Sequence, residues 1–145
     1  MNGLVKRCPA LLVLSMVWLL LSPGASAEEV IIVNPSVPYK ELSPNALRAV
    51  FGMRLRTWPN GNRITVFVLN DESAVHTRFA KQKLAIFPHQ LRLAWDRLVY
   101  SGTGQAPLEV VSEAEMRAKV AATDGAIGYL TVEMVDGSVR VLQIK

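Results

Sequence analysis

Two polar stretches of the chain hold the side chains best suited to bind a small ligand. Each follows an apolar, β-branched run that is typical of a buried strand. The candidate ligand-binding residues are Asn34, Ser36, Asn70, Asp71 and Ser73. All can hydrogen-bond through their side chains, and the first N–H groups of a helix lack partners and attract anions. The pattern predicts that these strand ends face one crevice and contact a small ligand. Turn formation and helix capping would use the same side chains and are the alternative roles.

Residues that could support metal binding or covalent catalysis are sparse. His76 and His89 are the two histidines, and neither has a carboxylate at the spacing of metal ligands, so no metal site is expected. His76 falls in the first turns of a predicted helix, where we expect it to be solvated. Glu113 and Glu115 are two apart on a predicted helix and would point to different faces. Without a Gly-x-Ser-x-Gly elbow, a P-loop or a Gly-x-Gly-x-x-Gly stretch, the sequence predicts neither an enzyme nor a cofactor.

The central predicted unit, residues 64–79, consists of a buried strand, a polar turn and a helix. Residues 64–69 are apolar and β-branched, and the polar residues that follow can cap a helix. Val75, Phe79 and Ile86 then recur at roughly helical spacing. A buried strand that leads into a helix N-terminus is where α/β proteins usually bind ligands.

The flanking segments carry their own start and stop signals. Ser43 and Pro44 predict a helix start, and Gly52 is expected to end that helix in the left-handed conformation. Ser112 and Glu115 form a predicted capping box. The remaining predicted elements are a strand at 30–33, a helix from Pro88 to Gly102 with Trp95 in the core, the end of the capped helix near Ala122, a strand at 126–130, and a C-terminal β-hairpin of 132–135 and 139–144. This order predicts one α/β domain with a mixed sheet.

The first 27 residues have the three parts of a secretory signal peptide. A basic start is followed by an apolar centre at 10–21 and a small-x-small cleavage site at 25–27. The apolar centre is too short to span a bilayer, which takes about 20 residues. We therefore expect cleavage after Ala27 and a periplasmic domain of residues 28–145 that is not embedded in the membrane.

Composition limits the classes of partner. The whole chain has 16 basic and 12 acidic residues, and loss of Lys6 and Arg7 with the signal leaves a net charge near +2. The remaining basic residues are scattered, so nucleic-acid binding is not expected. Cys8, the single cysteine, precedes the apolar centre, whereas a lipoprotein cysteine follows it. We therefore expect no lipid anchor, and a mature domain held together by its core alone.

Taken in order, several stretches resemble the phosphate-binding proteins of ABC transporters, which have the type II periplasmic binding protein fold. The matching stretches are 33–36, 42–52, 58–61, 64–79, 95–102 and 125–129. Together they span about residues 30–130 and resemble a short, single-lobe branch of that family. The resemblance implies a single-lobe α/β domain whose mixed β-sheet is flanked by helices, with the predicted C-terminal β-hairpin at its end.

The chain departs from this family at the turn that should hold the anion. The family has an arginine at the end of the central strand and a glycine-rich turn after it. Here Leu69 stands at the arginine position, and of the turn only Ser73 survives. Ala74 hinders close approach of the backbone, and Glu72 places a negative charge at the helix N-terminus, worth about 0.3–1 kcal/mol against an anion. The resemblance therefore implies weak binding of phosphate or another small oxyanion.

Two hypotheses of different class remain open on the sequence. The first is a secreted solute-binding protein related to phosphate transport, which binds a small oxyanion weakly and works with a membrane transporter. The second is a single-lobe scaffold or sensory protein that binds a protein partner, such as a sensor, and does not transport phosphate. Neither is an enzyme.

Overall fold

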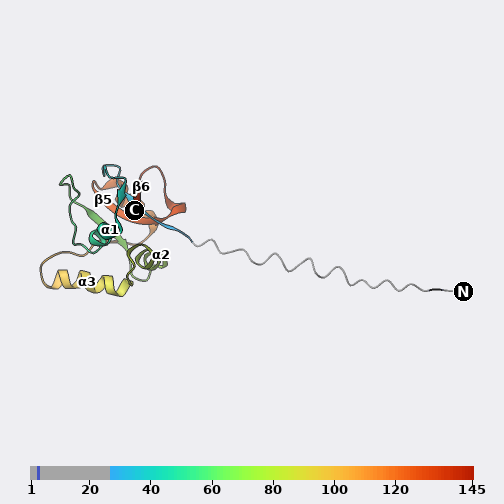
Figure 1. Ribbon diagram of the computed structural model, residues 1–145, viewed down its shortest axis with the longest axis horizontal. Coiled ribbons are helices and arrows are strands. Elements are labelled where there is room, and N and C mark those ends of the chain that lie inside the picture. The colour runs from blue at the N-terminus through green and yellow to red at the C-terminus, as the bar shows by residue number, and fades with distance from the viewer. Residues whose placement is uncertain (1–2, 4–26) are drawn as a thin grey trace.

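A six-stranded mixed sheet runs through the computed structural model, which describes Gly3 and residues 27–145 (Figure 1). The strands are β1 (Glu29–Val33), β2 (Glu41–Leu42), β3 (Thr65–Leu69), β4 (Leu108–Val110), β5 (Ala126–Thr131) and β6 (Arg140–Ile144), in the spatial order β2-β6-β1-β5-β3-β4. The predicted signal peptide lies outside the described residues, apart from Gly3 and Ala27. The α/β class and the mixed sheet predicted from the sequence are confirmed.

The strand directions decide which loops share an edge of the sheet. β3 runs parallel to β4 and β5, whereas β1 runs antiparallel to β5 and β6; the short β2 is parallel to β6. Because β1 and β3 both pair with β5 but in opposite senses, they run in opposite directions. Their carboxyl ends therefore lie at opposite edges of the sheet.

Helices cover both faces of the sheet. They are α1 (Pro44–Phe51), α2 (Ala74–Phe79), the π-helix η1 (Ala80–Leu84), α3 (Pro88–Tyr100), α4 (Glu113–Ala122) and the 3-10 helix η2 (Val132–Met134). Neighbouring residues of β5 identify the two layers, because successive side chains of a strand point to opposite faces. A Cβ on Gly128 would collide with Met116 of α4, while the Tyr129 ring stacks on Phe79 of α2 at 3.8 Å between centroids. Phe51 of α1 also packs on this second face.

Side-chain caps begin three of the helices, as the sequence predicts. The hydroxyls of Ser43, Ser73 and Ser112 each accept a hydrogen bond from the backbone N–H three residues on. At α4 the carboxylate of Glu115 accepts the N–H of Val111, at 2.8 Å, and not that of Ser112 itself. The capping box is therefore present in a form shifted by one residue.

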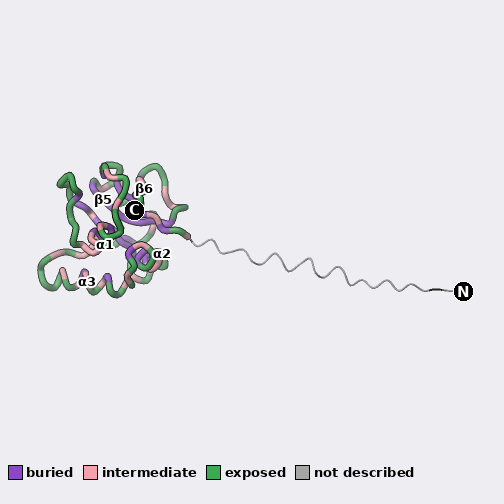
Figure 2. The backbone as a smooth tube through the Cα atoms, in the orientation of Figure 1, coloured by how far each residue is buried: buried purple, intermediate pink, exposed green. Residues whose placement is uncertain are grey.

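The core fills both faces of the sheet, and the buried stretches of the tube in Figure 2 follow its central strands. Trp95 is fully buried, as predicted, and its ring N–H donates to the carbonyl of Phe51 at 2.8 Å. Among the helices that the structure describes, none combines the length and hydrophobicity needed to cross a bilayer.

Two local predictions are wrong. The C-terminal β-hairpin does not form: residues 132–134 make the 3-10 helix η2, and β6 pairs with β1 and β2 instead. From this turn Met134 and Val135 pack against the core and are partly buried without strand pairing. At the end of α1, Gly52 has a φ of −76°, and the left-handed conformation falls on Met53, with a φ of 60°.

Candidate functional site

The turn after β3 places three of the predicted ligand-binding residues together. Ser73 caps α2 by accepting the N–H of His76 at 3.2 Å, and its own N–H donates to the carbonyl of Asn70 at 3.1 Å. Asn70 is exposed, and Asp71 is half-buried. This part of the sequence prediction holds as geometry: the strand, the polar turn and the cap follow one another as expected.

Asp71 is not free to meet a ligand, because Arg92 of α3 binds it. The guanidinium donates to both carboxylate oxygens, at 2.9 and 3.0 Å, and lies 5.0 Å from the centre of the Trp95 ring. Glu109 approaches the same guanidinium at 3.5 Å. The hydrogen bond from Arg92 holds the pKa of the Asp71 carboxyl below its usual value. Sequence reasoning missed Arg92, since it lies 21 residues from its partner and no local pattern connects them.

His76 is the second residue that the sequence misplaced. It was expected to be solvated, yet it is fully buried between Trp95 and Tyr129. Its Nδ1 lies 2.5 Å from the hydroxyl of Tyr129, which also accepts the N–H of Leu69 at 2.8 Å. The position of His76 in the first turns of a helix gave no sign that another element covers it. In the fold, Trp95 of α3 packs against the His76 ring and helps to bury it.

Burial determines the protonation of the His76–Tyr129 pair. Burial raises the pKa of Tyr129 well above its ordinary value, so its hydroxyl keeps its proton. That oxygen accepts the Leu69 N–H and shares a second hydrogen bond with His76 Nδ1, whose direction depends on the tautomer of the imidazole. Burial lowers the pKa of His76, which favours the neutral imidazole. Nε2 is 3.6 Å from an oxygen of Asp71 and has no hydrogen-bond partner among the described residues.

Asp71, His76 and Tyr129 follow one another in space in the order of a proton relay. A substrate in solvent could not reach the Tyr129 end of that relay. The Tyr129 side chain is 0% exposed and its raised pKa disfavours the phenolate, so it cannot attack a substrate from solvent. Within residues 27–145, no cluster of three or more histidines, cysteines or carboxylates is placed to bind a metal ion. The arrangement fits structural support of the turn better than chemistry.

Asn34 and Ser36 lie at the other edge of the sheet and serve the backbone there. The amide of Asn34 donates to the carbonyls of Val120 and Ala121 at the end of α4, both at 2.9 Å. Ser36 accepts the N–H of Gly125 at 3.0 Å. The prediction that all five residues face one crevice is therefore wrong, because the two groups are separated by the length of β5, about 15 Å.

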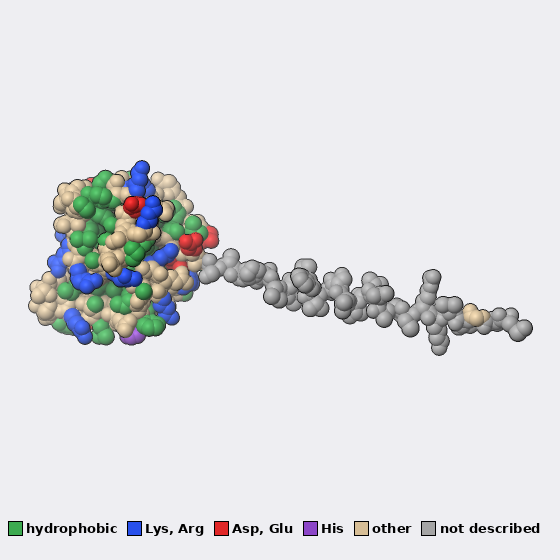
Figure 3. Space-filling view, in the orientation of Figure 1, with side chains coloured by type: hydrophobic (Ala, Val, Ile, Leu, Met, Phe, Trp, Pro, Cys, Tyr) green, Lys and Arg blue, Asp and Glu red, His purple; other side chains and the backbone are tan. Residues whose placement is uncertain are grey.

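The charges around the Asn70–Ser73 turn favour a closed ion pair over a bound anion. Arg92 is shared by the carboxylates of Asp71 and Glu109, and the exposed Glu72 adds a third negative charge beside the helix start. Elsewhere on the molecule, Lys and Arg side chains are scattered over the face seen in Figure 3 and form no single basic patch there. An anion that takes the Nε and Nη2 donors of Arg92 would therefore have to displace Asp71.

Solved structures share this architecture. An ABC-type phosphate transport receptor from Vibrio cholerae superposes with a TM-score of 0.64 at 18% identity, over 80% of this chain and 45% of that one. A Clostridium perfringens protein whose crystal structure contains bound phosphate gives 0.65 at 17%, over 80% and 44%. PstS from Borrelia burgdorferi gives 0.60 at 13%, over 81% and 47%. The chain thus spans less than half the length of these proteins.

The sequence comparison places the chain in a family. No protein with a curated description matches it. Residues 25–141, however, match the family described as the PBP superfamily domain, which covers nearly all of the folded part and agrees with the superposed structures. The chain therefore belongs to the PBP superfamily.

Proposed function

We propose that this protein is an exported, periplasmic solute-binding protein without enzymatic activity, in which the carboxylate of Asp71 occupies the place of an oxyanion ligand on Arg92. The observation that carries the proposal is the two-pronged contact of Arg92 with Asp71 at the Asn70–Ser73 turn. A guanidinium that holds a carboxylate in this way can hold phosphate or sulfate with the same pair of N–H groups. The cation missing at Leu69 would thus come from α3.

Competition with Asp71 explains why binding should be weak. The carboxylate belongs to the same chain, so its effective concentration at Arg92 is set by the fold and stays high at any dilution. An incoming phosphate would also face the charges of Glu72 and Glu109. We expect a Kd for phosphate of about 1 mM or weaker, equivalent to about 4 kcal/mol of binding free energy.

The likeness to phosphate-binding proteins supports this assignment of ligand class, since two of the three superposed structures are described by phosphate transport or bound phosphate. Their greater length supports a role for this chain as one lobe, which would contact a ligand from one side. A membrane transporter is the partner that the family suggests.

The test is calorimetric titration of phosphate into wild type, Asp71→Asn and the double variant Asp71→Asn/Arg92→Gln. The first substitution removes the competing charge and keeps the side-chain shape, so we expect at least tenfold tighter binding; the second should return binding to the wild-type level. Asp124→Asn, at the opposite edge of the sheet, is the matched control and should leave the affinity unchanged. Equal affinities in wild type and Asp71→Asn would refute the competition.

Export is tested separately. The proposed cleavage after Ala27 predicts that protein recovered from the periplasmic fraction begins at Glu28. N-terminal sequencing that returned Met1 would contradict it.

A scaffold that binds a protein partner is the alternative function, and surface apolar residues favour it. Tyr100 is 88% exposed at the end of α3, and Leu108 and Val111 at the β4 edge are 55% and 83% exposed. Absence of phosphate binding in wild type and in every variant above would make this alternative the better account.

A further inference from the structure

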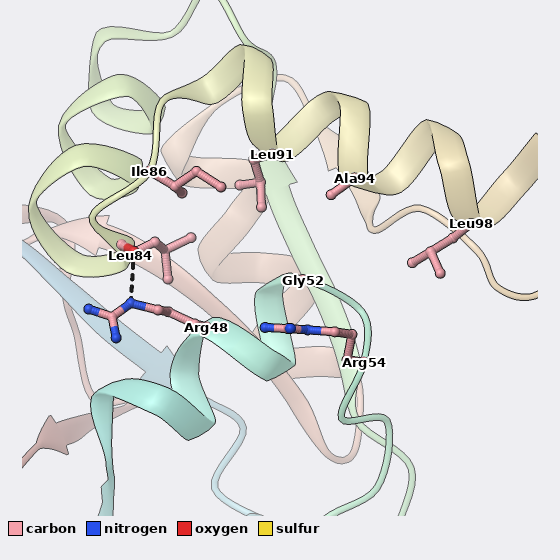
Figure 4. Close-up of a pocket in the computed structure, with 8 residues that line it drawn as sticks. All are labelled: Arg48, Gly52, Arg54, Leu84, Ile86, Leu91, Ala94 and Leu98. Atoms are coloured by element: carbon pink, nitrogen blue, oxygen red, sulfur yellow. Dashed lines mark hydrogen bonds between the residues drawn. The ribbon is translucent and has the colours of Figure 1, made fainter.

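A hollow lies between α1, η1 and α3, away from the Arg92 ion pair. Its volume is about 310 Å³, at the small end of the range of ligand pockets, which is about 300–1,000 Å³. Leu84, Leu91 and Leu98 are among the apolar side chains that form one wall. Arg48 and Arg54 form the other, and Figure 4 shows the α3 side chains pointing toward them. Its lining is thus largely apolar with a few fixed polar groups, as ligand pockets usually are.

The two arginines differ in how they are held. Arg48 donates from Nε to the carbonyl of Leu84 at 2.9 Å and from Nη1 to Asn45 at 3.1 Å, so it ties α1 to η1 (Figure 4). Arg54 makes no ion pair or side-chain hydrogen bond with the part of the chain that the structure describes. The lining includes no carboxylate. The hollow therefore combines an apolar wall with positive charge that is not neutralised locally.

The backbone has positive φ at two non-glycine positions, and each lies directly between two residues that line the hollow. Met53 (φ 60°) and Ala85 (φ 53°) are the two non-glycine residues with positive φ among the described residues. Met53 joins the lining residues Gly52 and Arg54, and Ala85 joins Leu84 to Ile86, which also lines the hollow. Non-glycine residues in this conformation, and π-helices such as η1, are found preferentially at functional sites. The positive-φ residues and the π-helix η1 influence where the neighbouring side chains of the hollow point.

We propose that this hollow binds a small organic acid with an apolar body, with its carboxylate on Arg54 and its hydrocarbon part against the wall formed by Leu84, Leu91 and Leu98. A guanidinium binds a carboxylate through paired N–H groups, and the apolar wall gives the hydrocarbon part a surface on which to leave water. Phosphate would leave the apolar wall uncovered, and a neutral hydrocarbon would leave the guanidinium without a partner. The site uses none of the residues at the Asp71–Arg92 pair, so it is independent of the function proposed above.

Titration with octanoate, followed by calorimetry and by NMR shifts of the purified protein, tests the proposal. Octanoate should bind saturably and shift signals of residues in η1 and α3. Octanol keeps the hydrocarbon and lacks the charge, and phosphate keeps a negative charge and lacks the hydrocarbon; each should bind at least tenfold more weakly at this site. Equal binding of octanol and octanoate would overturn the proposed role of the cation.

Variants locate the site. Arg54→Gln should weaken octanoate binding at least tenfold and, because Arg54 is exposed, should leave the unfolding midpoint near that of wild type. Arg97→Gln removes an exposed arginine of α3 that does not line the hollow and should bind octanoate like wild type. Ala94→Phe fills the hollow and should abolish binding. Unchanged octanoate binding in Arg54→Gln and Ala94→Phe would overturn the proposal. Self-association of the wild-type protein that Arg54→Gln prevents would also overturn it, and would indicate that the hollow contacts a second copy of the chain.

Discussion

Replacing Tyr129 by phenylalanine isolates the buried polar link beneath the candidate site. The substitution keeps the ring and its 3.8 Å stack on Phe79, so the packing of the core is preserved. It removes one oxygen, which accepts the Leu69 N–H at 2.8 Å and is hydrogen-bonded to His76 Nδ1 at 2.5 Å. Both former partners are buried and would be left without a hydrogen bond.

The expected loss of stability follows from those two orphaned groups. Each buried polar group left unpaired costs about 1–3 kcal/mol, so Tyr129→Phe should lower the free energy of unfolding by about 2–6 kcal/mol. That is a large part of the roughly 5–15 kcal/mol that stabilises a domain. Urea unfolding at pH 7.5 should show a lower midpoint with an unchanged slope. Tyr100→Phe, at an exposed position, is the control and should change little. A loss below about 1 kcal/mol for Tyr129→Phe would refute the hydrogen-bond assignment.

Three further perturbations test other parts of the fold. Burial lowers the pKa of His76 below its ordinary value of 6.5. As the pH falls through about 6.5, the unfolded chain therefore gains a proton that the folded chain does not, and the free energy of unfolding should decrease. Unfolding titrations should show this decrease, and it should be shallower in His76→Gln. Ser112→Ala should cost about 1 kcal/mol in thermal unfolding, since its hydroxyl caps α4. Gly125→Ala should cost at least about 2 kcal/mol, because φ is +72° and the added Cβ would collide with the carbonyl of Arg63; a neutral result would show that the turn relaxes.

The elements of this fold were predictable where the signal is local. A serine followed by a helical pattern marks a cap within a few residues: Ser43 and Ser112 cap their helices as predicted, and of the three polar residues that could cap α2, Ser73 does so. The same holds for Trp95, whose spacing on α3 places it in the core. Both signals can be read from residues close in sequence: a cap bonds a backbone N–H group a few residues on, and the apolar period marks the face of the helix that packs inward.

The candidate site was less predictable because it depends on which distant segments meet. Strand direction is a property of the whole sheet, so the sequence around Asn34 and around Asn70 could not reveal that β1 and β3 run oppositely. The link between His76 and Tyr129 joins residues 53 apart, and the apolar alternation at 132–135 was equally compatible with a strand and with the 3-10 helix that forms. Each of these outcomes is decided by tertiary packing.

The contrast between Leu69 and Arg92 explains how the turn should be tested. Restoring an arginine at Leu69 would follow the family pattern, but the Leu69 side chain is 3% exposed within β3, and a guanidinium there would have to leave water or disrupt the core. Arg92 already brings a guanidinium to the same turn from α3, held in place by Trp95 and by Asp71. The turn therefore lacks no cation. On the proposed function, the carboxylate of Asp71 limits anion binding at this turn, and removal of its charge is the smaller and more informative change.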